Sequence, residues 1–485
     1  MIKKIPSQIT EVLRTIEKAG FEAYVVGGCV RDLLMQRTPR DWDVTTNAKP
    51  EQVQSLFPES FYENDFGTVG VKVARFSPGD FEYDVVEVTT FRVESKYSDK
   101  RRPDAVRFAD TLAEDLSRRD FTINALALKI ANSDYEIIDL YAGQKDLQNK
   151  IIRTVGNPVE RFDEDALRMM RAIRFHSELG FQIEPATYAA IVNLKENMQH
   201  ISQERIKDEL VKIILSDDPA GGIDMLHETG LLAYVIPELE TGVGVAQSHH
   251  HIYTVYKHCL LALKHCPSPK LEVRLASLFH DIAKPQAKRG QGEEATFYNH
   301  DYLGAKVTET IMRRLRFSKE VTEKVRMLVE NHMFYYNPEE VGESSVRRLI
   351  QKVGLENMQD LIDVRVADRL GSGVPKAKPY KLRHLEYMVE KLSHDAVSVK
   401  MLRINGSDLI GELGFQPGPK IGAILDVLLS EVIEHSAKNE KGFLLTRAKE
   451  LEQEDLQKLR EMAKMKIEEK KEEDDKEIRD KYWVK

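Results

Sequence analysis

The chain has 485 residues, long enough for two or more domains that each bury a hydrophobic core. Its composition, with 42% hydrophobic and 31% charged residues, excludes a collagen-like chain and a wholly disordered one. The 71 basic and 79 acidic residues give a net charge of −8, so an RNA partner would have to be held by local basic surfaces.

The sequence predicts a cytoplasmic protein without a membrane span. No stretch approaches the roughly 20 apolar residues that a spanning helix needs. The N-terminal segment, MIKKIPSQITEVLRTI, is amphipathic and lacks both a long apolar run and a small-residue cleavage site. The three cysteines, Cys29, Cys259 and Cys266, form no CxxC zinc pattern, which fits a reducing compartment.

The order of helix and strand signals divides the chain into four parts. The first part mixes the two signals, and the second consists almost entirely of amphipathic helical patterns. The third is helical and rich in His, and the fourth is helical and ends in a charged segment typical of a solvated helix or a frayed tail. The predicted division is 1–135, 136–240, 241–372 and 373–485.

The first part begins with a helical pattern over residues 5–19. Strand-like runs follow at 21–28, 69–76 and 81–88. The glycine pair at the end of the first strand-like run precedes a predicted helix at 30–35, and glycines in such a turn let the backbone approach a phosphate.

Asp41 and Asp43 predict a metal site close to this glycine pair. They are separated by one residue just before a β-favouring run, and residues i and i+2 of a strand face the same way. Paired carboxylates attract a divalent cation such as Mg²⁺, which also binds phosphates. The DWD sequence alone would be read as a surface turn, but with the glycine pair it favours phosphoryl or nucleotidyl transfer.

Arginines in two later segments are suited to binding a triphosphate. Arg118 and Arg119 are predicted at the start of a helix that Asp120 can cap. A second predicted helix, EDALRMMRAIRF, begins with Glu164 and Asp165 and carries three arginines on about a third of its circumference. An i,i+3 salt-bridge ladder on a solvated face explains these charges, but it does not explain the apolar residues opposite them.

Five motifs occur in the order found in one enzyme family. They are GGCVRD with DWD, RRDFTINALA, DLYAGQKDL, EDALRMMRAIRF and ISQERIKDEL, over roughly residues 20–215. By these motifs the chain resembles the class II tRNA nucleotidyltransferases, which comprise the CCA-adding enzymes and the bacterial poly(A) polymerases. The resemblance implies an α+β fold with a polymerase-β-like nucleotidyltransferase head, followed by an all-α neck and body and a helical tail.

The resemblance also implies roles for individual residues. Asp41 and Asp43 match the catalytic carboxylates that bind Mg²⁺. Asp165 and Arg168 match the pair that reads the Watson–Crick edge of the incoming base. The complete set of residues that match nucleotide contacts is Gly28, Arg31, Arg119, Asp165, Arg168, Arg171 and Arg174. Residues 92–102 (RVESKYSDKRR) match the flexible loop that the family uses when it switches from C to A addition.

The His-rich third part predicts a second metal site. Its candidate ligands have apolar neighbours in the sequence: His258, His280, Asp281, His300, His332 and Asp368. Buried polar groups without partners are costly, and imidazole together with carboxylate suits Mn²⁺, Fe²⁺, Ni²⁺ or Zn²⁺ better than Mg²⁺ alone. The pattern resembles the HD phosphohydrolase superfamily, with every ligand position filled.

The predicted function is the addition of C, C and A to the 3′ end of tRNA from CTP and ATP, with an HD domain that could hydrolyse phosphate esters. In the tail, the run INGSDLIGELGFQPGPKIG predicts a turn that either contacts tRNA phosphates or joins two packed helices. The alternatives are an enzyme that adds only A or only CC, a poly(A) polymerase, chiefly an HD phosphohydrolase, and a non-catalytic RNA-binding protein. The intact metal ligands argue against the last two.

Overall fold

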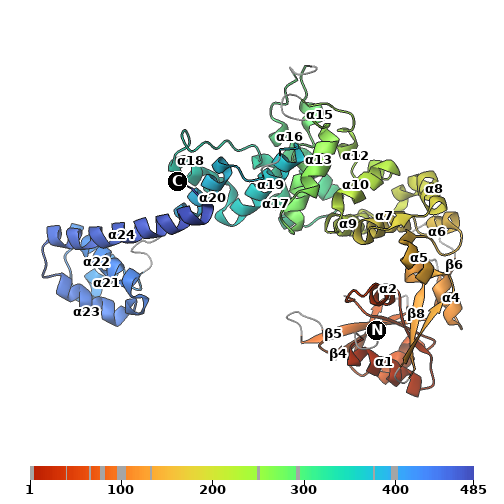
Figure 1. Ribbon diagram of the computed structural model, residues 1–485. Helices are drawn as coiled ribbons and strands as arrows, with labels where there is room; N and C mark the ends of the chain where they lie inside the picture. The colour runs from red at the N-terminus through yellow and green to blue at the C-terminus, as the bar shows by residue number, and fades with distance from the viewer. Residues whose placement is uncertain are drawn as a thin grey trace.

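The computed structural model describes residues 5–39, 41–64, 67–76, 82–95, 105–131, 134–247, 252–290, 295–374, 377–394 and 402–484. The molecule is elongated and curved, with a β-sheet at the N-terminal end, helices through the middle and a small helical unit at the far end (Figure 1). This arrangement confirms the predicted α+β fold, in which a sheet-containing head precedes helical parts.

The head is built on a seven-stranded sheet with the order β3-β4-β5-β2-β1-β8-β9. In this sheet β2 and β5 pair in parallel, whereas β1 pairs antiparallel with both β2 and β8. The strands are β1 (Ala23–Val26), β2 (Asp43–Thr46), β3 (Ser60–Asn64), β4 (Thr68–Ala74), β5 (Tyr83–Thr90), β8 (Leu126–Ala131) and β9 (Asp134–Asp139). The strands predicted at 21–28, 69–76 and 81–88 are confirmed as β1, β4 and β5.

Short helices complete the head. They are α1 (Ser7–Lys18), α2 (Gly28–Leu34), α3 (Pro50–Leu56), α4 (Leu112–Ser117) and the 3₁₀ helix η2 (Thr122–Asn124). The buried face of α1, which includes Ile9, Val12 and Ile16, shares a hydrophobic core with Val25 of β1 and Val44 of β2. This burial holds the central strands rigid; Asp43 is the first residue of β2, whereas Asp41 lies just before that strand.

Two details of the head differ from the sequence-based picture. A separate two-stranded antiparallel sheet pairs β6 (Arg92–Ser95) with β7 (Ala105–Phe108). The predicted flexible loop at 92–102 therefore begins as a strand, and its residues 96–102 lie outside the described residues. The domain boundary predicted at residue 135 falls within β9, because the hairpin of β8 and β9 continues to Asp139.

Helices follow the head almost without interruption. The first group is α5 (Gly143–Asn149), α6 (Pro158–Glu164), α7 (Leu167–Leu179), α8 (Pro185–Leu194), η3 (Lys195–His200), α9 (Gln203–Ile214), α10 (Pro219–Glu228), α11 (Leu232–Val235) and α12 (Pro237–Glu240), with the short parallel pair β10 (Ile151–Ile152) and β11 (Gln182–Ile183). The second group is α13 (Val255–Lys264), α14 (Leu271–Phe279), α15 (Lys284–Ala287), α16 (His300–Arg314), α17 (Lys319–Asn331), α18 (Glu343–Val353), η5 (Leu355–Asn357) and α19 (Met358–Gly371). One continuous core joins both groups, from Phe162 of α6 to Val364 of α19.

The tail comprises α20 (Tyr380–His394), α21 (Gly406–Leu413), α22 (Pro419–Glu434), η7 (Ser436–Lys438), α23 (Lys441–Leu451) and α24 (Leu456–Tyr482). The turn predicted after α21 is confirmed, because Gly414 has φ +69° and ends that helix. The charged segment predicted at the end of the fourth part covers residues 446–481, and most of it is helix α24. The C-terminal end of α24 contacts α20 through an ion pair between Lys481 and Glu390 (2.7 Å). Among the described residues, no helix is long and apolar enough to cross a membrane.

Candidate functional sites

Asp41 and Asp43 of the head both line one cavity. Trp42 between them is buried in the hydrophobic core of the head. Because neighbouring residues of an extended chain point in opposite directions, the two carboxylates point away from that core and into the cavity. Sequence reasoning missed a third carboxylate here. Glu87 of β5 is the register partner of Asp43 in the parallel pair and lines the same cavity.

Gly27 lies between the carboxylates and the arginines. Its φ is +80°, a conformation that L side chains rarely adopt. A Cβ atom at this position would lie 3.0 Å from Arg119 Nη1 and 3.5 Å from Asp43 Oδ2. Gly27 therefore keeps open the space between a cation and an anion, and the next residue, Gly28, begins α2.

Arg118 and Arg119 lie between α4 and the 3₁₀ helix η2, and Asp120 does not cap η2, so the predicted capped helix was wrong. Thr111 caps the N-terminus of α4, and the helix ends at Ser117. The two guanidiniums bind different oxygens of the buried Asp115, Oδ1 at 3.0 Å for Arg118 and Oδ2 at 3.3 Å for Arg119. Burial would raise the pKa of Asp115, but the two guanidiniums outweigh that effect and lower it.

The predicted helix EDALRMMRAIRF is interrupted at Asp165. Helix α6 ends at Glu164 and α7 begins at Leu167. Asp165 has extended backbone angles, and its carboxylate accepts the N–H of Leu167 at 3.1 Å. This hydrogen bond stabilises the start of α7 and takes Asp165 out of the helical register that the sequence suggested.

The two residues expected to read the base are held by different partners. Asp165 binds Arg205 of α9 through both carboxylate oxygens, at 3.2 and 2.7 Å. Arg168 binds Glu164 at 2.5 Å and also donates to the backbone carbonyl of Arg118. Arg168 is 8% exposed, and its contact with the chain just before Arg119 connects α7 with the head.

The remaining predicted arginines of α7 are also anchored by acids. Arg171 pairs with Asp120, and Arg174 lies 3.3 Å from Glu209 of α9. Burial would raise the pKa of Asp120, but the Arg171 guanidinium holds it well below its usual range. The guanidinium carbon of Arg174 lies 4.3 Å from the ring centroid of Phe175. The arginine heads are therefore fixed in place rather than mobile in solvent.

Arg31 of α2 reaches the same aromatic ring from the head. Its guanidinium lies 5.3 Å from the Phe175 centroid and donates to Asn124 at 2.9 Å. The Phe175 ring is therefore close to a cation from the head, Arg31, and to a cation from α7, Arg174.

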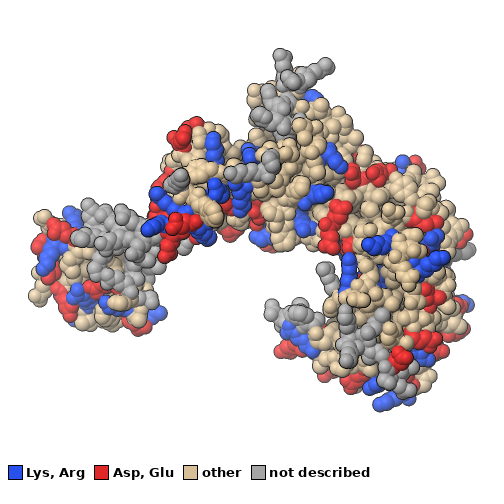
Figure 2. Space-filling model, viewed as in Figure 1, with Lys and Arg blue, Asp and Glu red and all other residues tan. Residues whose placement is uncertain are grey.

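The cavity has a volume of about 1080 Å³ and is lined by both the head and the helices. Every residue that the resemblance to the tRNA nucleotidyltransferases assigns to Mg²⁺ or to the nucleotide lies on its wall. Lining residues that sequence reasoning did not single out include Glu87, Phe175, Arg205 and Lys212. Arg205 does belong to the motif ISQERIKDEL, but its partner could not be read from the sequence. Basic side chains gather where the head meets α6–α9 (Figure 2).

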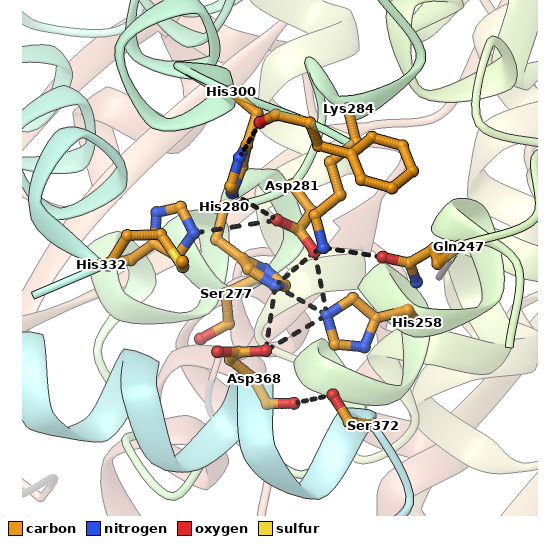
Figure 3. A network of polar contacts seen from close by, with 12 residues as sticks. Gln247, His258, Ser277, His280, Asp281, Lys284, His300, His332, Asp368 and Ser372 are labelled. Carbon is orange, nitrogen blue, oxygen red and sulfur yellow. Dashed lines mark hydrogen bonds and ion pairs between the residues drawn. The ribbon is translucent and has the colours of Figure 1, made fainter. Parts of the chain in front are cut away.

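The six predicted HD ligands converge in a second, separate cluster (Figure 3). They come from α13, the end of α14, the start of α16, the end of α17 and α19. Their ligand atoms form two groups, each within 4.8 Å: His258, His280 and Asp368, and then Asp281, His300 and His332. Asp281 links the groups, because its Oδ2 is 3.1 Å from His258 and its Oδ1 is 3.3 Å from His300.

The donor atoms of this cluster fit a metal site. Nδ1 of His280, His300 and His332 contacts a backbone carbonyl oxygen at 2.7–2.8 Å, which directs each Nε2 toward the cluster. Nε2 of His300 and of His332 is buried and makes no hydrogen bond with the described residues, although Asp281 Oδ1 lies 3.3 and 3.7 Å away. Lys284, which sequence reasoning missed, is 2.7 Å from Asp281 Oδ2 and also donates to Gln247.

Comparisons with known proteins agree along the chain. Residues 23–153 match the poly A polymerase head domain, residues 180–242 match the probable RNA and SrmB-binding site of polymerase A, and residues 300–448 match the putative tRNA nucleotidyltransferase domain 2. The chain is 35% identical to the CCA-adding enzyme of Enterococcus faecalis, over 92% of this chain and 97% of that protein. It is 36% identical to the CCA-adding enzyme of Lactobacillus delbrueckii subsp. bulgaricus, over 91% and 97%.

A solved structure is similar over nearly the same length. The crystal structure of the Bacillus stearothermophilus CCA-adding enzyme in complex with CTP has a TM-score of 0.60 and 29% sequence identity, over 92% of this chain and 98% of that one. Sequence motifs, cavity and similarity therefore agree, and the chain belongs to the CCA-adding enzymes of the tRNA nucleotidyltransferase family.

Proposed function

We propose that this chain adds C, C and A to the 3′ end of tRNA from CTP and ATP in the cavity between the head and α7. The observation that carries the proposal is that carboxylates from the head and arginines from α7 line one cavity. The similarity to the CCA-adding enzymes supports the same function.

In the proposed reaction the 3′ hydroxyl of the RNA attacks the α-phosphate of the nucleotide. A new oxygen–phosphorus bond forms, the bond to the bridging oxygen of the β-phosphate breaks, and pyrophosphate leaves. Asp41 and Asp43 would hold Mg²⁺, which stabilises charge on the reacting oxygens when it is bound. Asp41, Asp43 and Glu87 line one cavity, with Glu87 the register partner of Asp43, and three carboxylates are a suitable oxygen donor set for this ion.

The triphosphate would be bound by the cations around Gly27. Arg119 lies across Gly27 from Asp43, so it would contact phosphates close to the carboxylates. Gly28 begins α2, where the absence of a side chain lets a phosphate approach the backbone. Arg31, Arg171 and Arg174 would complete the positive wall near Phe175.

Asp165 and Arg168 would select the base. A carboxylate accepts a hydrogen bond from the amino group of cytosine or adenine, whereas uracil and guanine present an oxygen there. Both residues line the cavity, and both are held by partners that limit their motion. The protein itself would therefore act as the template.

The experiment uses purified full-length protein and tRNA transcripts that lack CCA, CA or A. Each nucleoside triphosphate is supplied alone, and the product ends are sequenced. The proposal requires C on the first two transcripts and A on the third. Addition of only A, of only CC, or of long A tails would replace it with the corresponding alternative.

A second function, hydrolysis of phosphate esters at the HD cluster, is favoured by the two groups of donors, which Asp281 of one group joins through its contact with His258 of the other. Each group would hold one cation, and nitrogen with oxygen donors suits Mn²⁺, Ni²⁺, Fe²⁺ or Zn²⁺. Such an ion supplies a water of lowered pKa. Phosphomonoesters and 2′,3′-cyclic phosphates at RNA ends are the substrates we propose, because only a free 3′ hydroxyl can be extended.

The test of this second function has two measurements. Binding of Mn²⁺ or Ni²⁺ to the full chain is measured directly by equilibrium dialysis, and hydrolysis is measured on the same samples. Binding without hydrolysis of any phosphate ester would leave the cluster a structural metal site.

The four-part domain division and the cytoplasmic location also remain predictions.

A further inference from the structure

We propose that Arg205 of α9 is a positioning residue that determines base selectivity by fixing the orientation of the Asp165 carboxylate. This inference rests on the proposed function, in which Asp165 reads the base. Arg205 is not itself a catalytic residue in this proposal, since it acts through Asp165.

The first support is the geometry of the pair. Arg205 Nη1 donates to Asp165 Oδ1 at 3.2 Å, and Nη2 donates to Oδ2 at 2.7 Å. This two-point contact is the planar arrangement that a guanidinium makes with a carboxylate and that a lysine cannot reproduce. The Asp165 side chain is 15% exposed and that of Arg205 is 30% exposed, so the pair is partly shielded from water.

The second support is the position of Asp165 in the chain. It lies between α6 and α7 with extended backbone angles, outside both helices. The N–H of Leu167 contacts only Oδ1. Arg205 holds Oδ2 as well, so it decides in which plane the carboxylate lies. A carboxylate in a fixed plane presents its remaining lone pairs in a fixed direction, which discrimination between an amino group and an oxygen requires.

The third support is the charge balance that α9 provides. Arg205 and Glu209 are four residues apart and so lie on one face of α9. Arg205 neutralises an acid of the cavity wall, while Glu209 lies 3.3 Å from Arg174. A bound triphosphate would be repelled by an unpaired Asp165, and the guanidinium removes that repulsion. Helix α9 therefore provides a cation for Asp165 and an anion for Arg174, and both of these residues line the cavity.

The experiment compares Arg205→Gln and Arg205→Lys with the wild type. Base selectivity is measured on matched transcripts as a ratio of two kcat/KM values. The numerator is the value for CTP or ATP, and the denominator is the value for UTP or GTP. We expect Arg205→Gln to lower this ratio by at least roughly tenfold. A loss of this size corresponds to the discrimination that one hydrogen-bonded base contact supplies. Arg205→Lys should be intermediate, because it keeps the charge but not the two-point contact. The ratio does not depend on the fraction of folded enzyme in a preparation.

The matched control is Lys207→Gln on the same helix, because Lys207 pairs with the exposed Asp208 and does not line the cavity. It should keep the wild-type ratio. The double variant Asp165→Ala/Arg205→Gln should have the same ratio as Asp165→Ala, since Arg205 acts through Asp165.

Two outcomes separate the failure of this inference from the failure of the proposed function. If Asp165→Ala keeps full discrimination, the proposed base-reading role of Asp165 is wrong. If Asp165→Ala relaxes discrimination but Arg205→Gln does not, Arg205 has no positioning role and the inference is overturned. A further loss in the double variant would also overturn it, because Arg205 would then act independently of Asp165.

Discussion

Asp43 of β2 and Glu87 of β5 are register partners in the parallel strand pair of the head sheet. Neighbouring strands are about 4.8 Å apart, and register partners point to the same face. Both residues line the nucleotide cavity. A third carboxylate therefore stands beside the two that the sequence motif identifies.

For Glu87 we expect that Glu87→Gln lowers nucleotide addition by roughly tenfold, because it removes a negative charge from the proposed cation site. Addition is measured at saturating CTP across a range of Mg²⁺ concentrations, and the variant should need more Mg²⁺. The control is Glu136→Gln on β9, whose side chain is exposed. An unchanged Mg²⁺ dependence in the Glu87 variant would exclude it from the site.

Asp43→Asn should lower addition by at least roughly 1000-fold, since a bound metal ion supplies several kcal/mol of charge stabilisation in such reactions. Binding of tRNA should stay within a few-fold of wild type, because phosphate contacts lie elsewhere. Single-turnover incorporation and filter binding measure the two properties. Asp134→Asn, an exposed change in the same sheet, is the control. Activity near the wild-type level would refute the metal site.

Gly27→Ala should weaken nucleotide binding and addition by roughly tenfold or more, because the new Cβ would lie 3.0 Å from Arg119 Nη1. The KM for CTP reports the disturbed phosphate site. The control is Gly20→Ala, since Gly20 also has a positive φ but no neighbouring heavy atom within 4 Å. If the two variants behave alike, backbone strain rather than the contact with Arg119 is responsible.

The HD cluster should be independent of the nucleotide cavity. Asp281→Ala removes the carboxylate that joins the two donor groups, so it should abolish Mn²⁺ or Ni²⁺ binding and any ester hydrolysis. Addition of C and A should continue, and Asp43→Asn should spare metal binding at the cluster. The exposed His265→Ala near α13 is the control. Where Asp281→Ala lowers thermal stability as well, Lys284→Met tests the cluster without removal of a proposed ligand.

The Asp120–Arg171 pair should make stability depend on pH. The pKa of Asp120 is lower in the folded protein than the ordinary value of about 3.9 in an unfolded chain. Its stabilising effect is therefore complete above that ordinary value and is lost as the pH falls toward the folded pKa. Asp120→Asn should cost about 3 kcal/mol near neutral pH. Thermal unfolding measures the free energy of unfolding of both proteins. The difference in this free energy between wild type and variant should narrow as the pH falls below about 4. A constant difference would contradict this account.

The sequence by itself determined the chemistry that the chain carries. The DWD spacing was enough to predict that Asp41 and Asp43 face the same way, as alternate residues of a strand do. Both line one cavity, although only Asp43 belongs to β2. The ordered motifs identified the family, and the apolar neighbours of the HD ligands predicted their burial. All six of those residues do converge.

Only the tertiary structure decided which charged groups are partners. Arg205 and Asp165 are 40 residues apart in the chain, and no periodicity relates α9 to the junction of α6 and α7. Glu87 becomes a neighbour of Asp43 through the register of a parallel pair, which depends on how the whole sheet assembles. The break at Asp165 was hidden for a related reason. Helical spacing continues through it in the sequence, whereas in the structure its carboxylate accepts the N–H of Leu167 at the start of α7. Local patterns determine residue types and faces, whereas long-range packing determines the pairs.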